Sequence, residues 1–239
     1  MQEKSSGKPA ASASGAGSVN PDSILCDSSS LIALTDSGLL GALIALKQKM
    51  KGRILITEGI IEESIIYPMK VPKYSFSAIR LKRALDSKVF DVIRFRQQTV
   101  DRILHLANNI FSSARPFHLV DRGEAELVAA AVDNNLKTLV MDERTTRMLM
   151  EAPMGLKKHL EGEFRIKLNV NTKLLNEFQQ ATSGIHVIRS SEIVALAYEA
   201  RYFKKFKDLE KKAYEAALYA IKFNGCAVGF DEISELVSS

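Results

Sequence analysis

SILCDSSSLI, residues 23–32, holds a short apolar run that ends on Asp27 and continues into three serines. A second run, Thr138 to Met141, ends on Asp142 in the same way. Short apolar runs that close abruptly are typical of strands buried on both faces in a parallel sheet. In such sheets, sites form at the carboxyl ends of the strands, where both aspartates would lie.

Strands and helices alternate along the rest of the chain. Further strands are predicted at 53–57 (RILIT), Val89–Ile93 and His186–Ile188, and an exposed one at Phe164–Val170. Helices are predicted over Leu31–Lys49, Glu58–Ile66, Ser77–Leu85, Gln97–Phe111, Glu124–Asn134, Glu143–Leu160 with a break near Pro153, Leu174–Ala181 and most of Ile193–Ala220, and a proline-containing loop over Tyr67–Tyr74. This order predicts an α/β fold, a three-layer α/β/α sandwich with a central parallel sheet.

Composition describes a globular protein of 239 residues with 46% hydrophobic residues and a net charge of +5. This charge is compatible with a polyanionic partner without demanding one. Two cysteines, Cys26 and Cys226, are too few for a disulfide framework or a zinc site. Residues 1–19 lack the apolar centre of a signal peptide, and no apolar run reaches the length of a membrane span. We therefore expect a cytoplasmic protein that does not contact membranes.

Carboxylates gather at the predicted strand ends. Asp27 and Asp142 would repel each other unless a positive charge lay between them, and Mg²⁺ or Mn²⁺ prefers such oxygen ligands. The alternative is that each aspartate caps the helix after its strand. Glu62 and Glu63 follow the second strand, and Glu124 lies in the first turn of the helix before Asp142. These further acids favour the cation site.

Four motifs carry a family resemblance. DSSSLI at 27–32 resembles the opening D-x-S-x-L-I of PIN domains, and TEGIIEES at 57–64 resembles their second acidic motif. DRGEAE at 121–126 and VMDERTTR at 140–147 are similar to the third and fourth. GIHVI at 184–188, followed by 190–196, is similar to the last core strand and helix, so the resemblance covers about residues 24–200.

The resemblance implies a PIN-like metal-dependent endoribonuclease. One or two Mg²⁺ or Mn²⁺ ions would be held by Asp27, Glu63, Glu124 and Asp142, although a one-residue shift would exchange Glu63 for Glu62. The supporting residues would be Ser29, Asp121, Glu143 and Arg147. For Asp121 the alternative is a capping box with Glu124, which stands three residues later. For Arg147 the alternative is a surface helix residue.

Three segments frame the predicted nuclease domain of residues 23–200. Residues 1–22, rich in Ser, Ala and Gly, are expected to be a disordered tail or linker. Residues 164–183 look like an insertion, either an arm that touches RNA or a partner, or a lid on the sheet edge. Residues 201–239 are expected to be a C-terminal helical extension packed on the domain.

Two basic runs are candidates for RNA contact. Lys204, Lys205 and Lys207 lie in RYFKKFKDLEKK (201–212), where aromatics alternate with charge, and Arg80, Lys82 and Arg83 follow the second strand. For residues 201–212 the alternative is an amphipathic helix that packs its aromatics inward.

Other functions compete with an RNA-cleaving enzyme. A catalytically silent PIN-like module would bind RNA or a protein partner, for example in ribosome or RNA-processing assembly, and a homodimer is compatible with either function. A phosphatase is disfavoured because Ser29 stands where an Asp-x-Asp nucleophile motif needs a second aspartate. The four histidines share no ligand spacing, and the chain lacks a phosphate-binding glycine loop.

Overall fold

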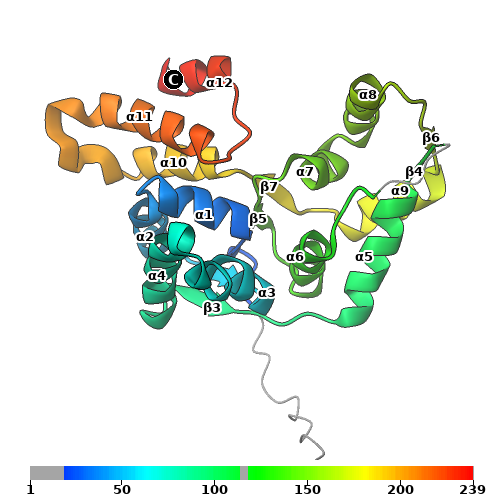
Figure 1. Cartoon of the computed structure of the whole chain (residues 1–239), viewed down its shortest axis with the longest axis horizontal. Helices are drawn as coiled ribbons and strands as arrows, with labels where there is room; N and C mark the ends of the chain where they lie inside the picture. Colours follow the sequence, from blue (N-terminus) through cyan, green and yellow to red (C-terminus); the bar gives the residue numbers. More distant parts are fainter. Residues whose placement is uncertain (1–18, 114–117, 239) are drawn as a thin grey trace, which may run out of the picture.

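A parallel sheet forms the centre of the computed structural model, which describes residues 19–113 and 118–238 (Figure 1). Its strands are β1 (Ile24–Cys26), β2 (Ile54–Ile56), β3 (Phe90–Val92), β5 (Thr138–Val140) and β7 (His186–Ile188). The strand order is β3-β2-β1-β5-β7, and every pairing is parallel. The strands that precede Asp27 and Asp142 are therefore neighbours.

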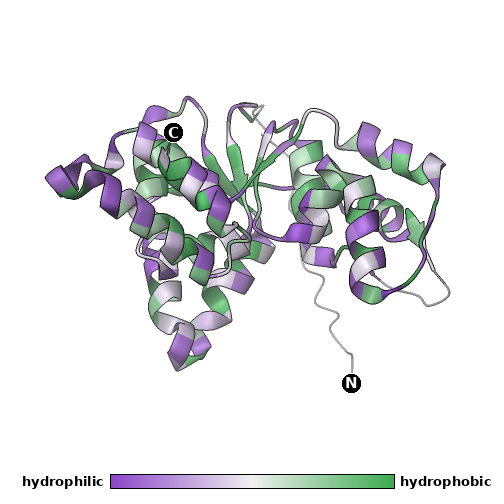
Figure 2. Ribbon diagram, turned by 90° about the horizontal axis from the view of Figure 1, so that it is seen from above, coloured by the Kyte–Doolittle hydropathy of each residue, from purple (hydrophilic) through white to green (hydrophobic). Residues whose placement is uncertain are grey.

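Helices cover both faces of this sheet. One group comprises α1 (Ser28–Asp36), α2 (Leu40–Lys49), α4 (Pro72–Asp86), α10 (Ser190–Glu199) and α11 (Glu210–Phe223), and the other comprises α5 (Gln97–Asn109), α6 (Arg122–Asp133), α7 (Arg144–Glu151), α8 (Pro153–Phe164) and α9 (Thr172–Ala181). Figure 2 shows the mainly hydrophobic strands between the two groups. The predicted three-layer sandwich with a central parallel sheet is confirmed.

The strands are short and apolar because both of their faces are covered. Leu25, Leu55 and Leu139, at the middle of three neighbouring strands, are completely buried. A strand buried on both sides has no solvent face, so its sequence does not alternate between apolar and polar residues. The polar positions begin where each strand ends.

Between β2 and β3 the chain forms α3 (Glu58–Ile61), the π-helix η1 (Glu62–Ile66) and the 3₁₀ helix η2 (Pro68–Lys70) before α4. The predicted loop over Tyr67–Tyr74 is therefore wrong. Pro72 begins α4, since a proline at the first helical position has a suitable φ and lacks only a donor that would stay unpaired.

The predicted continuous helix over Leu31–Lys49 is also wrong. It is broken into α1 and α2 at Gly38, whose φ of +72° lies in the left-handed region that glycine adopts without strain. Among the described residues, no single helix is long and apolar enough to cross a membrane. The pair α1 and α2 passes that test only when joined, and it is bent by 114°.

The predicted insertion packs beside α5. Phe164 ends α8 instead of beginning a strand, and Arg165 is left-handed, so the predicted strand over Phe164–Val170 is reduced to β6 (Asn169–Val170). β6 pairs antiparallel with β4 (Phe111–Ser112), and α9 packs against α5.

The chain ends in helices that pack on α10. They are η3 (Tyr202–Leu209), α11 and α12 (Phe230–Ser238), with α12 against α11. At the other end, residues 1–18 of the predicted tail lie outside the described residues. Asn20 donates to the Lys51 carbonyl at 3.1 Å, and Pro21 accepts from the Lys137 N–H at 3.3 Å.

Candidate active site

Asp27 lies directly after β1, in the middle of the sheet. Its Oδ1 accepts from the Ser28 N–H at 2.7 Å, which caps α1, and its Oδ2 accepts from the Ser29 hydroxyl. Burial raises the pKa of Asp27, and the charge of Glu63 adds to the rise, while the hydrogen bonds from Ser28 and Ser29 oppose it. Asp27 therefore caps α1, the alternative raised from the sequence, and its surroundings also disfavour its charged form.

Glu63 reaches Asp27 through a serine. The Ser28 hydroxyl donates to Glu63 Oε2 at 2.8 Å and lies 3.4 Å from Asp27 Oδ1. Glu63 belongs to the π-helix η1, in which the Tyr67 N–H donates to the Glu62 carbonyl at 2.9 Å, five residues back. Of the two adjacent glutamates, Glu63 is the one that accepts a hydrogen bond from Ser28, at the start of α1.

The first turn of α6 lies against Glu63. A Cβ added to Gly123 would lie 3.1 Å from Glu63 Oε1, so glycine leaves the room that this carboxylate occupies. The next residue, Glu124, accepts from the Asp121 N–H at 2.7 Å, and the two form the predicted capping box. The absence of a side chain at Gly123 thus lets the third acidic motif, residues 121–126, pack closely against Glu63 of the second.

Glu124, the third predicted acid, has a pKa shifted toward neutral pH. Burial raises its pKa to about 7, and the charges of Glu143 and Asp121 contribute. The Asp121 N–H and the Thr146 hydroxyl act in the opposite direction. Glu124 is therefore partly protonated near neutral pH when no cation is bound.

Asp142 is held by a distant helix. It is 4% exposed, and its two oxygens accept from the N–H and the hydroxyl of Ser190, each at 2.8 Å, at the beginning of α10. The neighbouring Glu143 caps α7, because it accepts from the N–H groups of Thr145 and Thr146 at 2.6 Å. Asp142 therefore does not cap the helix that follows its own strand.

Arg147 and the first basic run lie on different helices, α7 and α4. Arg147 pairs with Glu151 at 3.6 Å within α7. On α4, Arg80 donates to the Thr35 carbonyl at 2.6 Å, Lys82 bonds Asp86 at 2.6 Å, and Arg83 is exposed.

The second basic run lies elsewhere. Lys204, Lys205 and Lys207 are exposed on η3, at the end of the α10–α11 pair that points away from α6 and α7 (Figure 1). Phe203 of the same run is buried, so part of its aromatic content packs inward.

One family comparison bears on this arrangement. The model of the family DUF3368, described as a PIN domain, matches residues 23–157, more than half of the chain. The chain belongs to the PIN-domain family. No curated protein and no solved structure matches it. The match confirms the resemblance read from the sequence, and its range contains Asp27, Glu63, Glu124 and Asp142.

PIN domains are generally nucleases, typically use divalent metal ions and generally bind RNA. The donors in this PIN domain fit a hard cation. They are carboxylate and hydroxyl oxygens, the preferred ligands of Mg²⁺ and Mn²⁺. Asp27 carries a raised pKa beside Glu63, and Gly123 keeps space at Glu63 Oε1.

The carboxylates nevertheless do not form a closed cage. Within the described residues, no three His, Cys, Asp or Glu side chains group closely enough to hold an ion by themselves. Mg²⁺ commonly uses one or two carboxylates and completes its shell with water and substrate phosphate. Asp27 and Glu63 are the pair that suits this mode, with Glu124 following Gly123.

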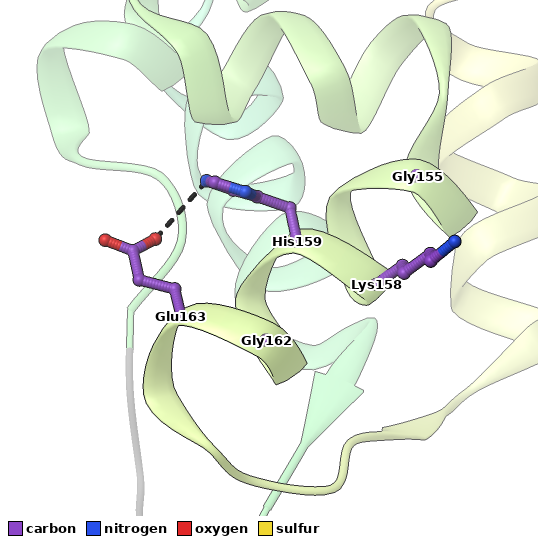
Figure 3. Close-up of a pocket in the computed structure, with 5 residues that line it drawn as sticks. All are labelled: Gly155, Lys158, His159, Gly162 and Glu163. Carbon is purple, nitrogen blue, oxygen red and sulfur yellow. Dashed lines mark ion pairs between the residues drawn. The ribbon is translucent and has the colours of Figure 1, made fainter.

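A shallow hollow on α8 is separate from these acids. Figure 3 shows it lined by Gly155, Lys158, His159, Gly162 and Glu163, with His159 Nε2 lying 3.3 Å from Glu163 Oε2. None of the four predicted acids lines it, and it adds nothing to the site.

Sequence reasoning missed three residues that position the acids. Ser28 follows Asp27 directly, so the serine run after β1 was a usable signal. Gly123 stands beside Glu124 in the third motif, but its contact with Glu63 joins segments 60 residues apart in the sequence. Ser190 carries no local signal, because its partner Asp142 lies 48 residues earlier.

Proposed function

We propose that this PIN domain is a Mg²⁺- or Mn²⁺-dependent endoribonuclease that hydrolyses RNA phosphodiester bonds at Asp27, Glu63, Glu124 and Asp142. The observation that carries the proposal is the pair Asp27 and Glu63, bridged by the Ser28 hydroxyl, in which burial and the charge of Glu63 raise the pKa of Asp27. Two such carboxylates from different segments are best compensated by a cation.

Each side chain has a distinct part in this proposal. Asp27 and Glu63 would hold the cation, and the hydroxyls of Ser29 and Ser28 fix the orientation of their carboxylates. Asp142 would complete the acidic edge, oriented by Ser190. When bound, the cation supplies an activated water and positive charge against the phosphate.

Glu124 is the group suited to proton transfer. A carboxyl with a pKa of about 7 can take up or release a proton at neutral pH, which general acid–base catalysis requires. Glu143 and Asp121 tune that pKa through their negative charges. They act as supporting residues, because Glu143 caps α7 and Asp121 begins α6.

RNA is the proposed substrate, and the basic residues divide by position. Arg80 and Arg83 belong to α4, which packs against η1 and therefore lies near Glu63, so we assign direct RNA contact to them, with Lys82 beside them. Lys204, Lys205 and Lys207 on η3 would instead contribute long-range attraction of the polyanion. Arg147, paired with Glu151, would hold α7 in place.

Cleavage of a labelled single-stranded RNA tests the proposal. The purified chain is incubated with Mg²⁺, Mn²⁺ or EDTA, and products are separated on a denaturing gel. We expect cleavage with either metal and none in EDTA. Asp27→Asn should reduce the rate by roughly 100-fold or more, because it removes a metal ligand.

Asp208→Asn is the matched control, since Asp208 is an exposed aspartate on η3 far from the acids. It should cleave at the wild-type rate. Equal rates in the wild type and Asp27→Asn would show that the activity comes from a contaminant or from another site.

The tight bonding of Asp142 to Ser190 and the lack of a three-acid group in the described residues favour a second candidate, a silent RNA- or protein-binding module. Calorimetric titration with Mn²⁺ separates the two. Heat of binding that disappears in Asp27→Asn supports the nuclease, and no heat at millimolar metal supports the silent module.

A further inference from the structure

An exposed aromatic and basic surface follows Glu63 along the chain. Tyr67, Tyr74 and Phe76 come from the end of η1 and the start of α4, and they are 56%, 50% and 71% exposed. Aromatic rings of this size are usually buried or partnered. Three exposed rings within ten residues therefore mark a contact surface.

A cation accompanies each ring. The Lys70 ammonium lies 5.2 Å from the Tyr67 centroid, the Lys73 ammonium 5.1 Å from that of Tyr74, and the Arg80 guanidinium 6.0 Å from that of Phe76. We call these six residues the aromatic–basic strip. Rings and cations side by side suit a ligand with flat bases and a charged backbone.

The segment that carries the strip has charges of one sign in its own sequence. Residues 64–85 contain Lys70, Lys73, Arg80, Lys82 and Arg83 and no aspartate or glutamate. Among the described residues, Lys82 pairs with Asp86, whereas the other four have no carboxylate partner. A surface with unpaired cations between exposed rings complements a polyanion better than it complements an average protein surface.

Packing and hydrogen bonds fix α4 on η1 and α1. α4 packs against η1 and α1, and Arg80 fixes it to the end of α1 through the Thr35 carbonyl at 2.6 Å (Figure 1). Ser77 adds a hydrogen bond to Asp36. The same π-helix that carries Glu63 leads into Tyr67, so the strip begins in the turn that carries this acid.

We propose that the aromatic–basic strip binds the unpaired stretch of RNA next to the cleaved bond, with bases stacked on Tyr67, Tyr74 and Phe76 and phosphates on Lys70, Lys73 and Arg80. This proposal rests on the proposed endoribonuclease function. It deepens that function, because stacking requires free base faces, which a duplex does not offer. The strip therefore selects single-stranded over double-stranded RNA.

Binding without cleavage tests the strip on the full chain. Fluorescence anisotropy in EDTA measures the affinity for a labelled 12-nucleotide single strand and for a 12-base-pair duplex. Tyr74→Ala/Phe76→Ala should weaken single-strand binding by roughly tenfold or more and leave duplex binding unchanged. Lys73→Gln should lower the slope of log affinity against log salt by about 0.7, the value for one lost phosphate contact on a single strand.

Phe164→Ala is the matched control. This ring at the end of α8 is also exposed, and α8 belongs to the helix group on the other side of the sheet from α4. The control should bind both RNAs as the wild type does. Equal losses in the strip variant and the control would overturn the proposal, as would unchanged single-strand affinity in the strip variant.

Two further outcomes distinguish RNA binding by the strip from a protein interface and from the endoribonuclease function. If the strip variant keeps its RNA affinity but loses a dimer that sedimentation shows for the wild type, the surface is a protein interface and the proposal is wrong. If the strip variant loses single-strand affinity while the wild type cleaves nothing with Mg²⁺ or Mn²⁺, the strip stands and the endoribonuclease function falls.

Discussion

Asp27 and Asp142 end neighbouring parallel strands, yet their surroundings differ. Asp27 is partly exposed and receives its hydrogen bonds from the next two residues in the chain. Asp142 is nearly buried and is bonded on both oxygens by Ser190 of α10. Both aspartates lie at the start of a helix, Asp27 at α1 and Asp142 at α10, and each start favours a negative charge. Burial nevertheless raises the pKa of Asp27, and the charge of Glu63 adds to the rise.

The difference shows that one sequence signal, an aspartate after an apolar strand, can serve two purposes. Asp27 is the more exposed acid, and its charged form is disfavoured by burial and by Glu63. Asp142 is the tied acid, which also links β5 to α10. Substitution of Asp27 should therefore affect mainly activity, whereas substitution of Asp142 should also affect stability, when both are measured on the same variants.

Replacing each aspartate by asparagine is the strongest way to break this comparison. Asp142→Asn should lower the free energy of unfolding by about 1–3 kcal/mol, since one of the two oxygens that accept from Ser190 becomes an NH₂ group and the remaining hydrogen bond loses its charge. Asp27→Asn should leave stability unchanged or raise it, because asparagine also caps helices and removes a strained charge. Urea unfolding in EDTA measures both, and an equal loss in the two variants would refute the distinction.

Gly123→Ala sharpens the Glu63 side of the comparison. The new Cβ would lie 3.1 Å from Glu63 Oε1 and push this carboxylate away, so metal-dependent cleavage should fall by roughly tenfold. Stability should not fall, because alanine favours a helix over glycine by up to about 1 kcal/mol. Gly162→Ala on α8 is the control, since nothing lies within 4 Å of its Cβ. A similar loss of cleavage in both variants would refute the contact.

Glu124→Gln has the smallest expected effect and a defined pH dependence. The folded-state pKa of Glu124 is raised to about 7 from 4.5, so the fold favours the neutral form. Its stabilising contribution is present below pH 4.5 and is lost as the pH rises through 7. In EDTA at pH 8, Glu124→Gln should therefore be more stable than the wild type by about 1 kcal/mol, after discounting for partial solvent exposure.

The gain should vanish at pH 4. Glu126→Gln, which removes a carboxylate paired with Arg122 at 3.4 Å on the same helix, should bring no gain at either pH. Thermal unfolding at the two pH values distinguishes these cases. A gain of equal size at pH 4 and pH 8 would contradict the assigned electrostatics.

The layers, the strands and the capping box at Asp121 could be predicted because their signals are local. Apolar runs mark the buried strands, and the capping box needs two residues three apart. The break at Gly38 was hidden because apolar residues continue at helical spacing on both sides of it. Pro72 was misread because proline both ends and begins helices.

The acids could be listed from the sequence, but their surroundings could not. The pair Asp142 and Ser190 and the contact between Gly123 and Glu63 join distant segments. No periodicity encodes such contacts, since they depend on how α6 and α10 pack over the sheet. The choice between Glu62 and Glu63 likewise depended on the turn that carries them.

That turn has a consequence for how the chain tolerates length changes. A π turn is an α-helix with one inserted residue, and each residue of an α-helix rotates the following side chains by about 100°. Deleting one residue from 62–66 would convert η1 into ordinary α-helix while the flanking elements keep their lengths. The deletion would rotate Glu63 relative to Tyr67 and α4, and so uncouple the acid from the surface that follows it. The extra residue therefore determines how the Glu63 side chain is oriented around the helix axis relative to Tyr67 and α4.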